Sequence, residues 1–217
     1  MANVAVVLAG CGFYDGAEIN EAVLTLLSLD QQGASYQCFA PDMAQMHVIN
    51  HLSGEPAAGE SRNVLVEAAR IARGNIRALT EATVDEFDAL MVPGGFGAAK
   101  NLSDFAVAGA DMQVQADFLA LAQAFHRAGK PIGLMCIAPV MAAAICGKGA
   151  RCTIGNDDDT AAAIAAMGGE HTACPVSEAR VDVDNKLVST PAYMLAEGVA
   201  QAYSGISACV KEVLALA

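Results

Sequence analysis

Short apolar segments alternate with longer helical patterns along most of this chain of 217 residues. The segments are rich in Val, Ile, Leu and Ala, and glycines such as Gly33 and Gly129 end the helical patterns between them. Strands joined by helices of this length form βαβ units, which predicts an α/β fold, a flavodoxin-like three-layer sandwich with helices on both faces of a mostly parallel sheet. The predicted strands are residues 4–8, 36–40, 89–92 and 132–135, and the predicted helices are residues 17–32, 63–72, 113–128 and 196–216.

Two regions depart from this alternation. Residues 179–183 and 186–190 flank the pair Asp184 and Asn185, which predicts a β-hairpin near the end of the sequence. Residues 41–60 show no clear periodicity, so we interpret them as an insertion that builds an extra hairpin. No linker or repeat divides the sequence, and its length suits a single domain over residues 1–217.

The charge balance and the lack of special segments exclude several classes of protein. Twenty-four acidic and twelve basic residues give a net charge of −12, whereas a protein that binds nucleic acid or an anionic membrane needs a basic surface. No apolar run approaches the roughly 18 residues that span a bilayer, and the first residues lack the basic segment of a signal peptide. These features favour a cytoplasmic protein.

The cysteines do not follow the spacing of a metal site. Seven are present and none form a CxxC pair, so neither a zinc site nor a dithiol motif is indicated. We therefore expect reduced thiols. The sequence also offers no site for a metal or an organic cofactor, so we expect none.

Cys136 lies directly between the predicted strand 132–135 and an apolar segment that Pro139 opens. This is the placement of a nucleophile elbow, in which a tight turn pushes a side chain out beyond the carboxyl edge of the sheet. The start of a helix favours thiolate, so we predict a thiol pKa below the ordinary value of about 8.5. The alternative is a small apolar core residue, as most free cysteines are.

A glycine-rich stretch, 92-VPGGFGAAKNLS-103, follows the predicted strand 89–92. Gly94 and Gly95 let backbone N–H groups approach a reacting centre closely. The N–H of Gly95 and that of Ile137 are candidates for an oxyanion hole. A phosphate-binding loop is the weaker alternative, because neither GxGxxG nor GxxxxGK[ST] occurs.

Two glutamates begin the helix after the first strand, in 10-GCGFYDGAEINEAV-23. Acidic residues in a first turn often only complement the helix dipole, an interpretation that suits Glu18. A glutamate that faces Cys136 in a partly apolar site has a raised pKa and can move protons near neutral pH.

Together these three stretches are similar to the PfpI/Parkinsonism-associated deglycase superfamily, whose fold is shared with class I glutamine amidotransferases. Further stretches resemble one branch, the ElbB family of isoprenoid-biosynthesis proteins with an amidotransferase-like domain, and the resemblance covers essentially the whole chain. The stretches that carry it include GCGFYDGAEINEAVLTLL, HVINHLSGE, RNVLVEAARIARG, VPGGFGAAKNLS, MCIAP, TIGNDDDTA and STPAYMLA.

The resemblance implies that Cys136 is the nucleophile and Glu21 its partner carboxylate, with oxyanion N–H groups from Gly95 and Ile137. Many members of the superfamily have histidine directly after the cysteine, where this chain has Ile137. His171 is the only histidine that follows Cys136, so it is a further candidate base. Cys11 is a candidate redox partner or a wall of the pocket.

The activity implied by the resemblance is that of a glutathione-independent glyoxalase, which converts glyoxal or methylglyoxal to glycolate or lactate. A homodimer is also implied, and the 54% hydrophobic composition suits such an interface. One alternative is a non-catalytic or redox-sensing protein that supports isoprenoid biosynthesis. Another is an amidotransferase-like hydrolase, which the missing histidine disfavours.

Overall fold

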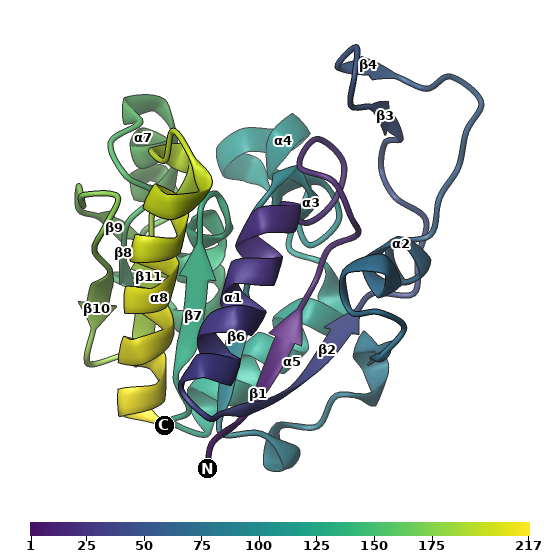
Figure 1. The fold of residues 1–217 in the computed structure, drawn as a ribbon. Coiled ribbons are helices and arrows are strands. Elements are labelled where there is room, and N and C mark those ends of the chain that lie inside the picture. The colour runs from purple at the N-terminus through teal and green to yellow at the C-terminus, as the bar shows by residue number, and fades with distance from the viewer.

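A seven-stranded sheet forms the centre of the protein, described over residues 1–217 by a computed structural model (Figure 1). Its strands lie in the order β10–β11–β7–β6–β1–β2–β5, and every neighbouring pair is parallel except β10 and β11. The strands are β1 (Asn3–Val7), β2 (Ser35–Ala40), β5 (Ile76–Ala78), β6 (Ala89–Val92), β7 (Ile132–Met135), β10 (Arg180–Asp182) and β11 (Leu187–Thr190). The predicted fold class is confirmed.

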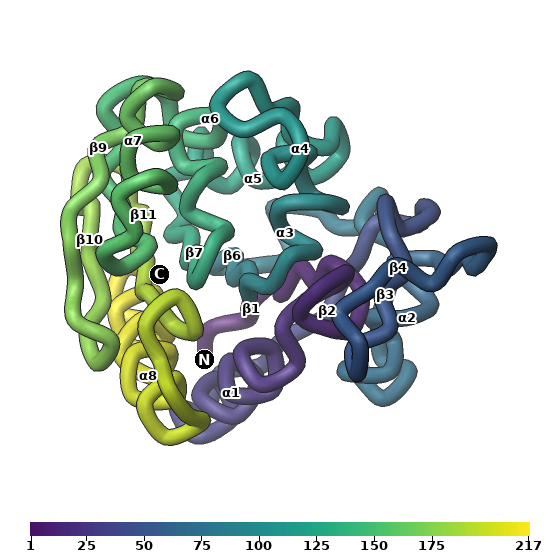
Figure 2. Tube along the Cα trace, turned by 90° about the horizontal axis from the view of Figure 1, so that it is seen from above, coloured from purple at the N-terminus to yellow at the C-terminus, as the bar shows by residue number.

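Helices cover both faces of this sheet. Alternate side chains of each strand point to opposite faces, and because these side chains are apolar, both faces need a covering layer. In β1, Val4 and Val6 pack with one set of helices, whereas Ala5 and Val7 pack with the other. The first set is α1 (Ile19–Gln31), α2 (Val64–Ile71) and α8 (Val199–Leu216), with α1 and α8 side by side (Figures 1 and 2). The second set is α3 (Phe96–Lys100), α4 (Phe105–Ala108), α5 (Ala116–Arg127), α6 (Ala142–Cys146) and α7 (Asp158–Ala166). None of these helices combines the length and apolar character that a membrane span requires.

Two helices begin two or three residues later than predicted, each at a point where a side chain caps the helix. α1 begins at Ile19 because the carboxylate of Glu18 accepts the N–H of Glu21 at 2.6 Å. α5 begins three residues after its predicted start, where Gln115 accepts the N–H of Phe118. Strand β5 was not predicted, because a three-residue edge strand is too short to show a period.

Short elements complete the chain. A two-stranded parallel sheet pairs β8 (Arg151–Cys152) with β9 (Glu170–His171). Five 3₁₀ turns, numbered η1 to η5 along the chain, lie at Leu79–Glu81, Val84–Glu86, Gly109–Asp111, Ala138–Met141 and Ala192–Met194. The hairpin predicted near the end of the chain is confirmed as β10 and β11.

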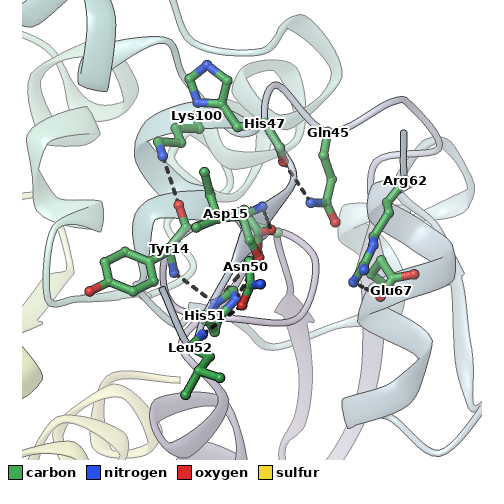
Figure 3. A network of polar contacts seen from close by, with 12 residues as sticks. Tyr14, Asp15, Gln45, His47, Asn50, His51, Leu52, Arg62, Glu67 and Lys100 are labelled. Atoms are coloured by element: carbon green, nitrogen blue, oxygen red, sulfur yellow. Dashed lines mark hydrogen bonds and ion pairs between the residues drawn. The ribbon is translucent and has the colours of Figure 1, made fainter. Parts of the chain in front are cut away.

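The insertion at residues 41–60 contains the extra hairpin that was predicted. β3 (Ile49–Asn50) pairs antiparallel with β4 (Glu55–Pro56), and both stand away from the central sheet (Figures 1 and 2). Polar contacts join the insertion to the loop after β1, where Asp15 accepts the N–H of Ile49 at 2.7 Å (Figure 3). His51 receives the N–H of Tyr14 at 3.3 Å.

Candidate active site at the carboxyl edge of the sheet

A cavity of about 630 Å³ opens where β6, β7 and β11 end. Its wall comes from the loop after β1, the start of α1, the glycine-rich loop, the elbow at Cys136, α4, α7 and the turn after β11. The lining residues are Phe13, Glu18, Asn20, Gly95, Phe96, Ala99, Phe105, Ala106, Cys136, Ile137, Asp157, Thr160, Tyr193 and Met194. In open parallel sheets, ligands bind at this edge.

Cys136 sits in the cavity wall on a strained backbone. Its φ of 59° lies in the left-handed region, which costs about 1–3 kcal/mol for a residue with a side chain. The N–H of Cys136 donates to the carbonyl of Thr190 at 3.0 Å, so β11 fixes the turn. The residue is 7% exposed. This conformation is the one that a nucleophile elbow adopts.

Glu21 lies directly behind Cys136 and is fully buried. One carboxylate oxygen accepts the N–H of Gly94 at 2.8 Å and the other accepts the N–H of Tyr193 at 3.1 Å. The thiol of Cys136 lies beside this carboxylate and favours its ionised form. Burial raises the pKa of Glu21 to about 7, against the lowering effect of these bonds.

The two adjacent glycines have different roles in this geometry. A Cβ on Gly94 would collide with the Cβ of Cys136 and lie 2.7 Å from a carboxylate oxygen of Glu21, so only glycine fits between them. Because the N–H of Gly94 is bound to Glu21, it positions that carboxylate and is not available to an oxyanion. Gly95, with φ of 88°, is tightly packed against the backbone of Glu18.

Two backbone N–H groups lie near the sulfur of Cys136 and lower its pKa. They belong to Gly95 and Ile137, and neither takes part in a backbone hydrogen bond elsewhere. An oxyanion formed on a carbon attached to the sulfur would lie next to both donors. The pair proposed from the sequence is therefore brought together at Cys136.

The thiol pKa differs in direction from the prediction. Burial raises the pKa of the Cys136 thiol well above its ordinary value, and the negative charge of Glu21 raises it further. The helix that was expected to favour thiolate begins as the 3₁₀ turn η4, and α6 after it has only five residues. A short helix supplies too weak a dipole to offset burial.

Glu18 caps α1 and lines the cavity. Its carboxylate is half-buried, and burial raises its pKa. Glu18 was predicted to complement the helix dipole from the first turn, and the structure places it at the N-cap instead, where it accepts the N–H of Glu21. Asp157 likewise caps α7 by accepting the N–H of Thr160 at 2.8 Å.

The remaining candidates, Cys11 and His171, do not line the cavity. Cys11 lies near Glu67, Arg70 and Asp15, whose charges act on its thiol. His171 belongs to β9 in the small second sheet. Nowhere do three His, Cys, Asp or Glu side chains gather as metal ligands do.

Sequence reasoning missed one direct partner of Glu21 and most of the cavity wall. Ala192 has a φ of 46°, and the turn that it makes aims the N–H of Tyr193 at Glu21. An alanine with positive φ gives no signal in a sequence. Phe13 and Phe96 had a signal, since each follows glycine in a loop at the carboxyl edge of a predicted strand.

Comparison with known proteins identifies close relatives. No family model matches the chain. It is 50% identical to the Homo sapiens "Glutamine amidotransferase-like class 1 domain-containing protein 3, mitochondrial", over 99% of this chain and 83% of that protein. The crystal structure of an isoprenoid biosynthesis protein with an amidotransferase-like domain from Ehrlichia chaffeensis is 39% identical. It superposes with a TM-score of 0.93 and covers 100% of this chain and 99% of that one.

A more distant likeness shows the fold alone. A DJ-1 superfamily protein from Salmonella typhimurium is 20% identical, with a TM-score of 0.54 over 94% of this chain and 86% of that one. The three-layer architecture is thus shared with this superfamily.

The predicted cytoplasmic location is wrong. The human relative is named a mitochondrial protein, as are relatives from Rattus norvegicus and Danio rerio. The prediction rested on the composition, on the lack of a membrane-spanning run and on the first residues of the sequence, and the names of these three relatives overturn it.

Proposed function

The chain belongs to the family of glutamine amidotransferase-like class 1 domain-containing proteins, and we propose that it is a cysteine-dependent glyoxalase that needs no glutathione. The observation that carries this proposal is the contact between Cys136 on its strained turn and Glu21, whose pKa is raised to about 7. A carboxyl group that titrates near neutral pH is matched to proton transfer at that pH.

In the first step the sulfur of Cys136 adds to the aldehyde carbon of glyoxal or methylglyoxal. Because burial raises the pKa of the thiol, Glu21 takes the thiol proton as the new C–S bond forms. The aldehyde oxygen gains the negative charge, which the N–H groups of Gly95 and Ile137 stabilise. Return of the proton to this oxygen gives a neutral hemithioacetal.

In the second step a proton moves between the two carbons of the adduct. Ionised Glu21 removes the hydrogen, as a proton, from the carbon bound to sulfur, which forms an enediolate. The hydroxyl proton on that carbon passes to the neighbouring oxygen, and the carboxyl group of Glu21 then protonates the neighbouring carbon, which leaves a thioester. One carbon is oxidised and the other reduced, so no external oxidant is needed. Water then cleaves the thioester, which releases glycolate or lactate and restores the thiol of Cys136.

The test is an assay of the purified protein with glyoxal and methylglyoxal in the absence of glutathione. Wild-type protein is expected to form glycolate and lactate over many turnovers, and Cys136→Ala is expected to form none. Cys146→Ala is the matched control, since Cys146 is a free cysteine outside the cavity. A wild-type rate equal to that of Cys136→Ala would refute the proposal.

The same assay distinguishes a glyoxalase from proteins with two other functions. A redox-sensing protein would show oxidation of Cys136 in proportion to added peroxide and no turnover of dicarbonyls. An amidotransferase-like hydrolase is less well supported, because no histidine lines the cavity to orient or deprotonate the cysteine.

We also propose that the protein forms a homodimer. Ile19, Val23 and Leu27 are exposed at successive turns of α1 and make an apolar stripe on its outer side. Light scattering should give about twice the chain mass of 22.2 kDa, and Val23→Glu should lower the mass toward that of one chain. A monomeric wild-type protein at micromolar concentration would contradict this.

A further inference from the structure

The cavity beside Cys136 is much larger than glyoxal or methylglyoxal requires. Its volume of about 630 Å³ lies within the range of pockets that enclose drug-sized ligands, roughly 300–1,000 Å³. A water molecule takes up about 30 Å³ in the liquid. A dicarbonyl with only a few non-hydrogen atoms would therefore leave most of the cavity filled with water.

The wall of the cavity gathers the phenylalanines that are not buried in the core. The chain has seven phenylalanines, of which Phe39, Phe87, Phe118 and Phe125 are buried in the core. The other three are Phe13, Phe96 and Phe105, and all of them line the cavity. Phe13 and Phe96 are 41% and 43% exposed, with ring centroids 6.2 Å apart. Exposed rings at this spacing offer a surface on which an aromatic group can pack.

The charged groups of the wall are all acidic. Glu18 and Asp157 line the cavity, and hydrogen bonds from Thr160 lower the pKa of Asp157, which keeps it ionised. No Lys, Arg or His belongs to the wall. The amine of Lys100 lies near Phe96, but it donates to the carbonyl of Tyr14 at 2.8 Å (Figure 3). An anionic substrate would meet repulsion there and find no cation in the wall.

From these observations we infer that the site takes an α-oxoaldehyde with a bulky, apolar group of aromatic size and no acidic group. The inference rests on the proposed function for the reacting end of the molecule. The apolar group packs against Phe13, Phe96 and Phe105 while the aldehyde meets the sulfur of Cys136. The 2-hydroxy acid produced is an anion, so Glu18 and Asp157 favour its release.

The test of size and charge uses alkylation of Cys136, which does not depend on turnover. Three reagents are compared at pH 7, namely iodoacetamide, its N-benzyl derivative and its N-(4-carboxybenzyl) derivative, with mass mapping of all seven cysteines. We expect the benzyl reagent to react with Cys136 roughly tenfold or more faster than iodoacetamide, and the carboxybenzyl reagent to lose most of that gain. Equal rates for the benzyl reagent and iodoacetamide would overturn the inference.

Two variants with matched controls identify the groups responsible. Phe13→Ala should remove most of the benzyl preference, whereas Leu52→Ala, which changes an exposed apolar side chain outside the cavity, should keep it. Asp157→Asn keeps the helix cap and should accelerate the carboxybenzyl reagent, while Asp158→Asn, outside the cavity, should not. A benzyl preference that survives Phe13→Ala unchanged would count against the aromatic wall.

Turnover separates this inference from the proposed function. For wild-type protein, kcat/KM should be higher for phenylglyoxal than for methylglyoxal by roughly tenfold, and Phe13→Ala should bring the ratio of the two values close to one. If no dicarbonyl is turned over but the benzyl preference holds, the glyoxalase proposal fails and the selectivity of the cavity stands. If methylglyoxal is turned over as fast as phenylglyoxal, the selectivity fails and the glyoxalase stands.

Discussion

Glu21 and Asp15 are buried carboxylates that follow β1, and they have different surroundings. Glu21 is fully buried and accepts two backbone N–H groups, and its third neighbour is the thiol of Cys136 at the cavity. Asp15 is 3% exposed and accepts the N–H of Ile49, and its other close partner is the ring of His51, 3.8 Å away (Figure 3). Burial is nearly the same for both.

The difference lies in what each carboxylate faces. Glu21 faces the thiol of Cys136, which lines a large cavity, so in the proposed mechanism a change in its protonation reaches the reacting molecule. Asp15 faces the backbone of β3 and an exposed histidine, so it holds the insertion against the loop after β1. Buried acids become catalytic groups through their neighbours, and burial alone does not select them.

The largest effect is expected from Glu21→Gln. Loss of the proton acceptor should lower kcat with glyoxal by about 10²–10⁴-fold. The amide NH₂ would face the N–H of Gly94 or of Tyr193, so one donor loses its partner and stability should fall by about 1–3 kcal/mol. Steady-state kinetics and thermal unfolding measure the two effects, and a folded Glu21→Gln with a wild-type kcat would remove Glu21 from the mechanism.

The next effect is a dependence of stability on pH. Glu21 has a pKa raised from 4.5 to about 7, so between these values the folded protein keeps a proton that the unfolded chain loses. Its contribution to the free energy of unfolding is therefore complete below pH 4.5 and is lost as pH rises through about 7. The loss amounts to about 3 kcal/mol for a shift of this size.

Urea unfolding of wild type and Glu21→Gln across this pH range measures that loss. The difference between the two stabilities should fall with rising pH, because only the wild type carries the titrating group. A difference that stays constant across the range would mean that Glu21 is ionised throughout.

The candidate site and the insertion differ in how much of their structure the sequence predicted. The strand–helix alternation predicted the parallel sheet, and the placement of Cys136, Gly95 and Ile137 at strand ends predicted their meeting, because parallel strands end at one edge. The turn at Ala192 could not be predicted, since positive φ at alanine depends on tertiary packing. The raised thiol pKa was missed because burial at the site is set by segments distant in sequence.

In the insertion, the sequence predicted a hairpin but not what holds it. Asp15 and Ile49 are far apart in sequence, and neither residue type marks the contact. That contact follows from how the loop after β1 and the insertion fold over each other, which local patterns do not encode.

A smaller effect is expected from Asp15→Ala. The buried N–H of Ile49 loses its acceptor, which should cost about 1–3 kcal/mol and make residues 41–60 easier to cleave with protease. Turnover should fall much less than in Glu21→Gln, since Asp15 does not line the cavity. Asp42→Ala is the control, because Asp42 is exposed and bonds Asn63 from the same insertion. Equal cleavage of both variants would show that Asp15 does not secure the insertion.

The smallest effect is expected from Glu18→Gln, which removes a charge one turn before Glu21. The amide oxygen can still accept the N–H of Glu21, so stability should change by only a few tenths of a kcal/mol. The charge of Glu18 raises the pKa of Glu21, so its removal should shift the acid limb of the kcat profile to lower pH while the plateau stays near the wild-type value. The kcat of this variant and of Glu21→Gln is measured with glyoxal over the same pH range. If Glu18→Gln were inactive and Glu21→Gln active, the proton carrier would be Glu18 in the cavity wall. The contact between Glu21 and Cys136 would then have only a structural role.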